Sequence, residues 1–135
     1  METERIIPNH IGFIVDGNRR WAKARGLSVY DGHMTGYKVM HDIAAATFRA
    51  GVKYVSAYIF STENWKRSSE EVRDLLNLVM QLLTTDLEEF IKNDIRLKII
   101  GTRDNLSPEL IAAINSAEEK TKDNQGGVLA LCFNY

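Results

Sequence analysis

Three short segments of this chain hold the side chains that could do chemistry. The first is Asp16-Gly17-Asn18-Arg19-Arg20-Trp21, which follows an apolar run at 11–15. A carboxylate at the end of a buried strand can act on a metal ion or a proton. Two arginines at the start of a helix that Asn18 caps can bind a phosphate. An ordinary turn followed by surface arginines would have the same composition, so this segment alone leaves both interpretations open.

The second segment, Gly32-His33-Met34-Thr35-Gly36, precedes an expected helix, and the third is Ser61-Thr62-Glu63-Asn64-Trp65-Lys66-Arg67. His33 could donate to a pyrophosphate or move a proton, or it could be a loop histidine that caps a turn. The third segment combines hydroxyls, an amide, an aromatic ring and cations, which suits an anionic ligand with an apolar tail. Glu71 follows Ser68 by three residues, and a capping box is a sufficient explanation for it.

The elements that must position these segments alternate along the chain. Apolar and β-branched runs predict strands at 11–15, 52–60, 96–100 and 128–135, and helical spacing predicts helices at 36–50, 68–90 and 108–123. We therefore expect an α/β domain with a central parallel sheet and helices on both faces. Ligands of such sheets bind beyond the carboxyl ends of the strands, so Asp16 and the segment 61–65 should share one mouth. The leucines of 68–90 are core residues or line a tunnel for an alkyl chain.

Composition limits the possible functions. The chain has 135 residues, a net charge of −1 and one cysteine, Cys132, which predicts a single domain over 1–135 and argues against nucleic acid as a partner. A lone cysteine forms no disulfide framework within the chain, and no histidine pair has zinc-ligand spacing. The polar, acidic N-terminus is unlike a secretory signal, so we expect a cytoplasmic protein, peripheral at the membrane at most.

Together, these segments resemble the cis-prenyltransferases, the family of undecaprenyl diphosphate synthase and dehydrodolichyl diphosphate synthase. The resemblance covers the whole chain in order and is highly specific. It rests on His10–Trp21, on Gly32-His33 with Gly36, on Tyr58–Arg67, on Arg96–Gly101 and on Phe133-Asn134-Tyr135.

This resemblance implies that isopentenyl diphosphate is condensed onto an allylic prenyl diphosphate, with Mg²⁺ as cofactor and a polyprenyl product delivered to the membrane. Asp16 would hold Mg²⁺ and would be catalytic together with Asn64. The residues that would contact the two substrates are Gly17, Asn18, Arg19, Arg20, Trp21, His33, Ser61, Thr62, Glu63, Trp65, Arg67 and Glu71.

Two departures from the family pattern affect this expectation. Val29 stands where many members carry an arginine, and relatives continue beyond Tyr135 with a region that this sequence lacks. The resemblance implies that this C-terminal region carries an Arg-x-Ser-Gly-Glu-x-Arg motif and a glutamate that completes the Mg²⁺ site. We therefore expect either an enzyme that acts as a homodimer or with a partner subunit supplying that motif, with little activity of the isolated chain, or a non-catalytic protein. The non-catalytic protein would be a subunit that binds prenyl diphosphates, a partner subunit or a degenerate homologue.

Overall fold

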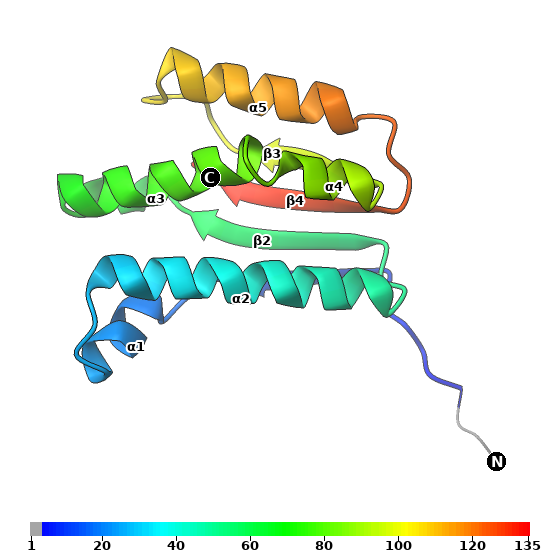
Figure 1. Ribbon diagram of the computed structural model, residues 1–135, viewed down its shortest axis with the longest axis horizontal. Coiled ribbons are helices and arrows are strands. Elements are labelled where there is room, and N and C mark those ends of the chain that lie inside the picture. The colour runs from blue at the N-terminus through cyan, green and yellow to red at the C-terminus, as the bar shows by residue number, and fades with distance from the viewer. Residues whose placement is uncertain (1–3) are drawn as a thin grey trace.

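A four-stranded parallel sheet forms the centre of the protein, with the strands in the order β1-β2-β4-β3. Figure 1 shows β2, β4 and β3 in this order. The computed structural model describes residues 4–135. The strands are β1 (His10–Ile14), β2 (Tyr54–Phe60), β3 (Ile95–Ile100) and β4 (Gly127–Phe133). The helices are α1 (Asn18–Ala24), α2 (Val29–Arg49), the 3₁₀ helix η1 (Thr62–Lys66), α3 (Ser69–Leu83), α4 (Leu87–Lys92) and α5 (Pro108–Thr121). The predicted parallel α/β sheet is confirmed.

The core lies between the sheet and the helices. Strand residues alternate between the two faces, so every second side chain of β2, β3 and β4 points toward the helices. Val55, Leu129 and Leu97 stand in register across these three strands, and all are buried. Helices α2, α3, α4 and α5 contribute Ala44, Val79, Leu87 and Ile114 to the same cluster.

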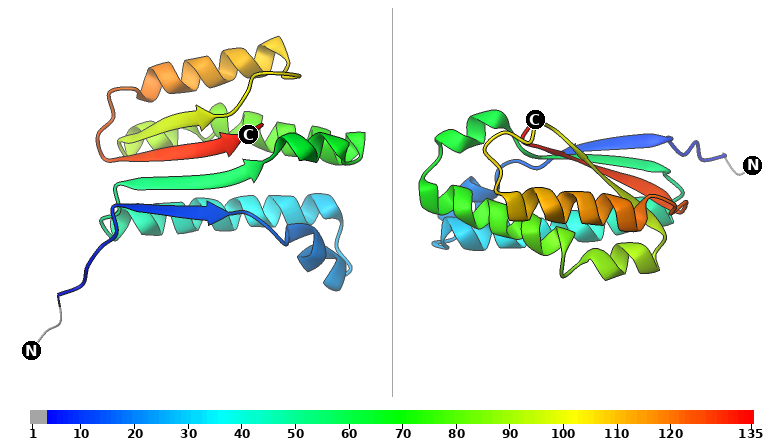
Figure 2. Two further views of the ribbon diagram at one scale, coloured as in Figure 1. Left: turned by 180° about the vertical axis from the view of Figure 1, so that it is seen from behind. Right: turned by 90° about the horizontal axis from the view of Figure 1, so that it is seen from above.

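The helices cover one face of the sheet, and the prediction of helices on both faces is wrong for the residues described. Seen from behind, the strands stand in front of the helices, with no helix of residues 4–135 over them (Figure 2). One row across this face is Ile14, Tyr58, Cys132 and Ile100. The prediction failed because the run of β4, with Val128, Ala130 and Cys132 on this face, reads as a strand buried on both sides, although Ser56 and Lys98 are polar here.

Helix α2 begins seven residues earlier than the sequence predicted. Ser28 caps it by accepting a hydrogen bond from the Asp31 backbone N–H (3.0 Å), so His33 lies inside the helix. The glycines that suggested a loop serve a close helix contact instead. A Cβ on Gly32 would lie 2.5 Å from the backbone oxygen of Asn18, and one on Gly36 would overlap the Asn18 side chain. Glycine therefore lets α1 approach α2 closely.

The long helix predicted at 68–90 is two helices, because residues 84–86 interrupt it. Thr84 donates its hydroxyl to the Met80 carbonyl (2.7 Å), and the chain leaves helical geometry at this residue. Threonine favours such local hydrogen bonds over a continuing helix. Within residues 4–135, none of the helices has both the length and the apolar character needed to span a membrane.

Candidate functional site

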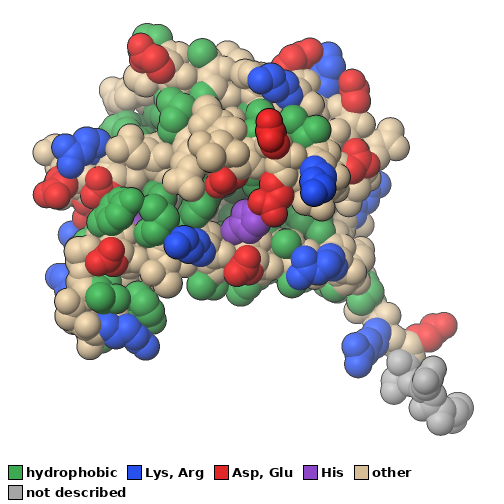
Figure 3. Space-filling model, viewed as in Figure 1, with side chains coloured by type: hydrophobic (Ala, Val, Ile, Leu, Met, Phe, Trp, Pro, Cys, Tyr) green, Lys and Arg blue, Asp and Glu red, His purple; other side chains and the backbone are tan. Residues whose placement is uncertain are grey.

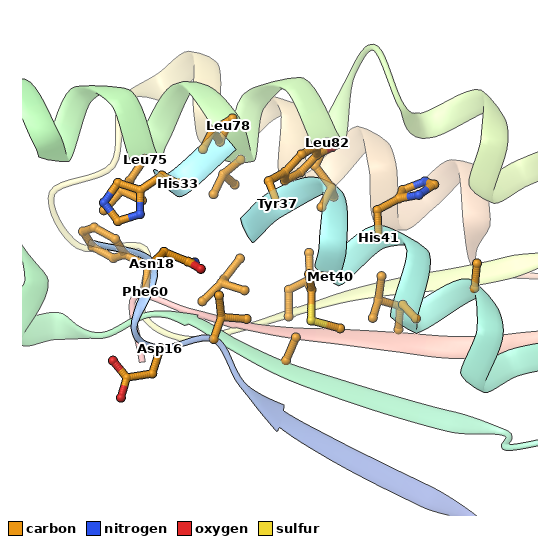
Figure 4. Close-up of a pocket in the computed structure, with 18 of the residues that line it drawn as sticks. Asp16, Asn18, His33, Tyr37, Met40, His41, Phe60, Leu75, Leu78 and Leu82 are labelled. Carbon is orange, nitrogen blue, oxygen red and sulfur yellow. The ribbon is translucent and has the colours of Figure 1, made fainter. Parts of the chain in front are cut away.

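A pocket of about 730 Å³ lies between the sheet and helices α2, α3 and α4. Figure 4 shows Asp16, Asn18 and His33 at one end, His41 further along α2, and three leucines of α3 facing the space between. The pocket interior is mainly apolar. Its apolar lining residues include Met40, Ala44, Phe48, Ile59, Leu75, Leu78, Val79, Leu82, Leu129 and Leu131.

Polar side chains gather at the end of the pocket where β1 and β2 finish, and we call this end the mouth. It is lined by Asp16, Gly17, Asn18, Arg19, Arg20, His33, Asn64 and Arg67. These residues come from the loop after β1, from α1, from α2 and from the segment after β2. The structure thus brings together residues of all three predicted segments, with His33 as the one from the second segment, and Asp16 and Asn64 share one mouth as the sheet geometry predicted.

Asp16 lies at the outer rim of the mouth. Its side chain is 75% exposed, accepts a hydrogen bond from the Gly17 backbone N–H (2.7 Å) and lies 3.3 Å from Arg20. Gly17 precedes α1 with a φ of 87°, a conformation that glycine adopts without strain. Asn18 was expected to cap this helix; Gly17 is the cap residue instead, and the Asn18 side chain packs against Gly36.

Beside the mouth, four side chains form a cluster that we call the Glu71 cluster: Glu71, His33, Arg19 and Arg67. His33 Nε2 lies 3.0 Å from Glu71 Oε1, Arg67 donates to the same oxygen at 2.9 Å, and Arg19 donates to Oε2 at 2.9 Å. Burial by itself would raise the pKa of the Glu71 carboxyl. The hydrogen bond from His33 and the charges of Arg67 and Arg19 outweigh it and lower that pKa.

The capping box predicted at Ser68 and Glu71 is only half formed. The Ser68 hydroxyl accepts from the Glu71 backbone N–H (3.2 Å), but the Glu71 carboxylate turns to the arginines and His33 instead. A complete capping box occurs one segment earlier, where Asn64 Oδ1 accepts from the Ser61 backbone N–H (2.9 Å). This contact leaves the Asn64 amide N–H groups available at the mouth.

The other predicted site residues do not line this pocket. Trp65 donates its indole N–H to Asn134 (2.8 Å) and packs edge-on against Phe60, while Arg25 stacks over Trp21 at 4.4 Å. Thr62 and Glu63 are exposed. Ser61 and Glu71 support residues of the mouth without lining it. The structure therefore divides the predicted set into residues at the pocket and residues around it.

Two polar pairs join α2 to the chain after α3, further from the mouth. The Tyr37 hydroxyl donates to Asp86, and His41 Nε2 lies 3.2 Å from Glu89. Burial and the Asp86 carboxylate raise the pKa of Tyr37 above its ordinary value of 10.0. Hydrophobic side chains and a histidine reach the surface between these helices (Figure 3).

Sequence analysis did not select Tyr37, His41 or Ala44, although all three line the pocket. With Met40 they follow the i, i+3, i+4, i+7 spacing of one helix face. That spacing was the available signal, but it does not distinguish a pocket wall from a packed core.

Comparison with known proteins finds similarity to isoprenyl transferases and prenyl diphosphate synthases. The family model for undecaprenyl diphosphate synthase matches residues 14–135. An isoprenyl transferase of Clostridium perfringens is 45% identical over 98% of this chain and 52% of its own length. A chloroplastic nerylneryl diphosphate synthase of Solanum lycopersicum is 43% identical over 98% of this chain and 41% of its own.

Among solved structures, lavandulyl diphosphate synthase of Lavandula x intermedia, in complex with dimethylallyl diphosphate, superimposes with a TM-score of 0.90. It is 34% identical, and the match covers 96% of this chain and 56% of the lavender chain. The present chain thus spans about half the length of the curated relatives that it matches.

Proposed function

Because this chain belongs to the undecaprenyl diphosphate synthase family of prenyltransferases, we propose that it binds an allylic prenyl diphosphate and serves its condensation with isopentenyl diphosphate. The observation that carries this proposal is the two-part pocket. Arginine and histidine side chains gather at its mouth, and the interior behind them is mainly apolar. An anionic head group joined to a hydrocarbon tail matches this division.

In this proposal the diphosphate occupies the mouth, and the tail runs along α2 toward His41. Arg19, Arg20 and His33 would contact the phosphates, and Met40 and Leu82 would contact the tail. Charged hydrogen bonds to phosphate are the stronger kind, and each buried CH₂ group of the tail adds about 0.8 kcal/mol. When the C–O bond to the allylic carbon breaks, negative charge builds on the departing pyrophosphate, and the arginines stabilise that charge.

We propose Mg²⁺ as a cofactor that Asp16 would hold together with the substrate diphosphate. No cluster of three or more histidine, cysteine or acidic side chains that could hold a metal ion occurs among residues 4–135. Mg²⁺ is commonly bound by one or two carboxylates together with substrate phosphates. Asp16 supplies one exposed carboxylate at the rim, so we propose it as the protein ligand. Bound there, Mg²⁺ would neutralise charge on the diphosphate.

The second substrate and the partner complete the proposal. Asn64, with free amide N–H groups, and Arg67 lie at the mouth on the side of η1 and are candidates for contacts with isopentenyl diphosphate. Relatives are about twice as long as this chain. We therefore propose that sequence equivalent to their other half completes the second site, and that the protein acts as a homodimer or with a partner subunit that carries this sequence. An apolar polyprenyl product would pass to the membrane, with the protein cytoplasmic or peripheral to it.

Calorimetric titration of the purified chain tests this function. Farnesyl thiodiphosphate should bind at least about tenfold more tightly than inorganic pyrophosphate, because only the former fills the apolar interior. Arg20→Ala should weaken binding of both ligands about ten- to a hundredfold, and Mg²⁺ should strengthen it in the parent but not in Asp16→Ala. Arg25→Ala, an exposed change outside the pocket, is the matched control. Equal affinity for the two ligands, or none for either, would refute the function.

A further inference from the structure

Glu71 receives hydrogen bonds from parts of the chain that are far apart in sequence. Arg19 lies in α1, His33 in α2 and Arg67 at the end of η1, while Glu71 itself is in the first turn of α3. The Glu71 side chain is 4% exposed. Its two carboxylate oxygens thus collect three donors inside the protein, and no other described carboxylate does so.

Glu71 stands behind the mouth. Arg19, His33 and Arg67 all line the pocket, whereas Glu71 does not. An arginine has five N–H donors, and each of these two arginines uses one on Glu71. Their other donors are therefore free for a ligand. One carboxylate between two arginines also reduces the repulsion between them and still leaves a net positive charge at the mouth.

The contact with Glu71 also fixes which ring nitrogen of His33 carries a proton. An ionised carboxylate only accepts hydrogen bonds, so His33 Nε2 must donate to it. Nδ1 is then the ring nitrogen that Glu71 does not engage, and it can donate to a diphosphate oxygen only when it also carries a proton. A partner that orients one imidazole nitrogen in this way determines the role of the other.

We propose, on the basis of the function proposed above, that Glu71 is a positioning residue. It does not contact the diphosphate, and it holds Arg19, Arg67 and, through the Nε2–H group, the ring of His33 in the arrangement that binds it. Two physical effects then predict opposite results for its removal. Charge alone predicts tighter anion binding, because a negative charge leaves the mouth. Positioning predicts weaker binding, because the partly exposed arginines turn to water.

The first experiment measures pyrophosphate and farnesyl thiodiphosphate affinity by calorimetry in three variants. Glu71→Gln should bind both ligands about tenfold more weakly or worse, since an amide cannot accept three donors. Glu71→Asp keeps the charge with a shorter reach and should recover part of the affinity. Glu70→Gln removes the neighbouring exposed carboxylate of α3 and should bind as the parent does. Unchanged or tighter binding by Glu71→Gln overturns the proposal.

The second experiment needs no ligand and no variant of Glu71. Nitrogen-15 NMR spectra of the parent chain distinguish the two tautomers of each of its three histidines, and His33→Gln assigns the signal. His33 should be found with its proton on Nε2. A dominant Nδ1–H tautomer overturns the proposal. If Glu71→Gln folds, its His33 signals should move toward a mixture of tautomers, and those of Glu70→Gln should not.

The two proposals fail in different ways. If the parent binds neither pyrophosphate nor the farnesyl analogue, the proposed function fails, whatever the spectra show. If the parent binds both and Glu71→Gln binds equally well, the function stands and the positioning role of Glu71 is refuted.

Discussion

Both ends of the pocket join α2 to the helices opposite it through polar side chains, but in different surroundings. At the mouth, the Glu71 carboxylate is 4% exposed and takes three donors. Further along, His41 and Glu89 form one contact with side chains 27% and 56% exposed. Exposed pairs contribute little because water competes for both partners, whereas breaking a buried pair strands charges. The same residue types therefore fix the geometry of the mouth and only loosely connect the helices beyond it.

Glu71→Ala should produce the largest loss of stability. It strands the buried His33 and leaves two arginines without their partner, so the free energy of unfolding should fall by about 3 kcal/mol. This is the low end for a broken buried pair, because Arg19 and Arg67 can turn to water. Urea denaturation measures the change. Glu70→Ala, on the exposed side of the same turn, should change stability by less than about 0.5 kcal/mol; equal effects would contradict the comparison.

Gly32→Ala tests the close packing that holds α1 and the mouth against α2. Alanine is the better helix former by about 1 kcal/mol, but its Cβ would lie 2.5 Å from the Asn18 backbone oxygen. The cost of overpacking should exceed the gain in helix propensity, so the free energy of unfolding should fall by about 1–2 kcal/mol. Thermal denaturation measures this change. The exposed Ala46 of α2 provides the control. There Ala46→Gly should cost about 1 kcal/mol from helix propensity alone. A stabilised Gly32→Ala variant would mean that α1 and α2 separate easily.

The mouth should respond to acid. The folded pKa of Glu71 is lower than its ordinary value of 4.5, so its contribution is complete above pH 4.5 and is lost as the pH falls through the folded pKa. The stability difference between the parent and Glu71→Gln should therefore shrink below pH 4.5. Urea denaturation at a series of pH values measures it, and a constant difference would show that Glu71 does not titrate with folding.

The middle of the pocket should respond to alkali instead. The folded pKa of Tyr37 is raised, so the contribution of Tyr37 is complete below its ordinary value of 10.0 and is lost at higher pH. Tyr37→Phe should remove this alkaline sensitivity while costing about 1 kcal/mol at neutral pH for the lost hydrogen bond. Parallel denaturation of parent and variant above and below pH 10 checks this. Identical pH profiles would count against a structured Tyr37–Asp86 contact.

His41→Gln should have the smallest effect. An exposed pair contributes between about 0.2 and 1 kcal/mol, so the free energy of unfolding should change by about 0.5 kcal/mol or less. A double-mutant cycle with Glu89→Gln isolates the pair from other contacts of His41. The same cycle for Glu71 and Arg67 gives the coupling energy at the mouth. If the two coupling energies are equal, the two ends of the pocket do not differ in the way described.

The parallel sheet could be predicted from sequence because runs such as 54–60 and 127–133 are long and mainly apolar, and because they alternate with helical patterns. The absence of helices from one face of the sheet could not be predicted, because β1 has an uninterrupted apolar run that looks buried on both sides. The position of His33 was missed for a related reason. Gly32 and Gly36 suggest a loop when only local propensity is considered, and their role depends on α1, which lies elsewhere in the sequence.

The site divides in the same way. The meeting of Asp16 with Asn64 and Arg67 was predictable, since parallel strands end at one edge of the sheet. The hydrogen-bond partners of Glu71 could not be predicted from the sequence. Its sequence neighbours Ser68 and Arg67 explain it locally, while Arg19 and His33 are 52 and 38 residues away and become neighbours only through helix packing.

The strand order has a consequence for how the protein folds. β4 follows β3 in the sequence but lies between β2 and β3 in the sheet. During synthesis, β3 therefore has no neighbouring strand until residues 127–133 have left the ribosome. Such long-range pairing folds slowly, because loop closure must precede the contacts that reward it. Leu129 and Leu131 therefore take their places in the pocket wall only when β4 pairs, and until then β2 and β3 expose edges that β4 will cover.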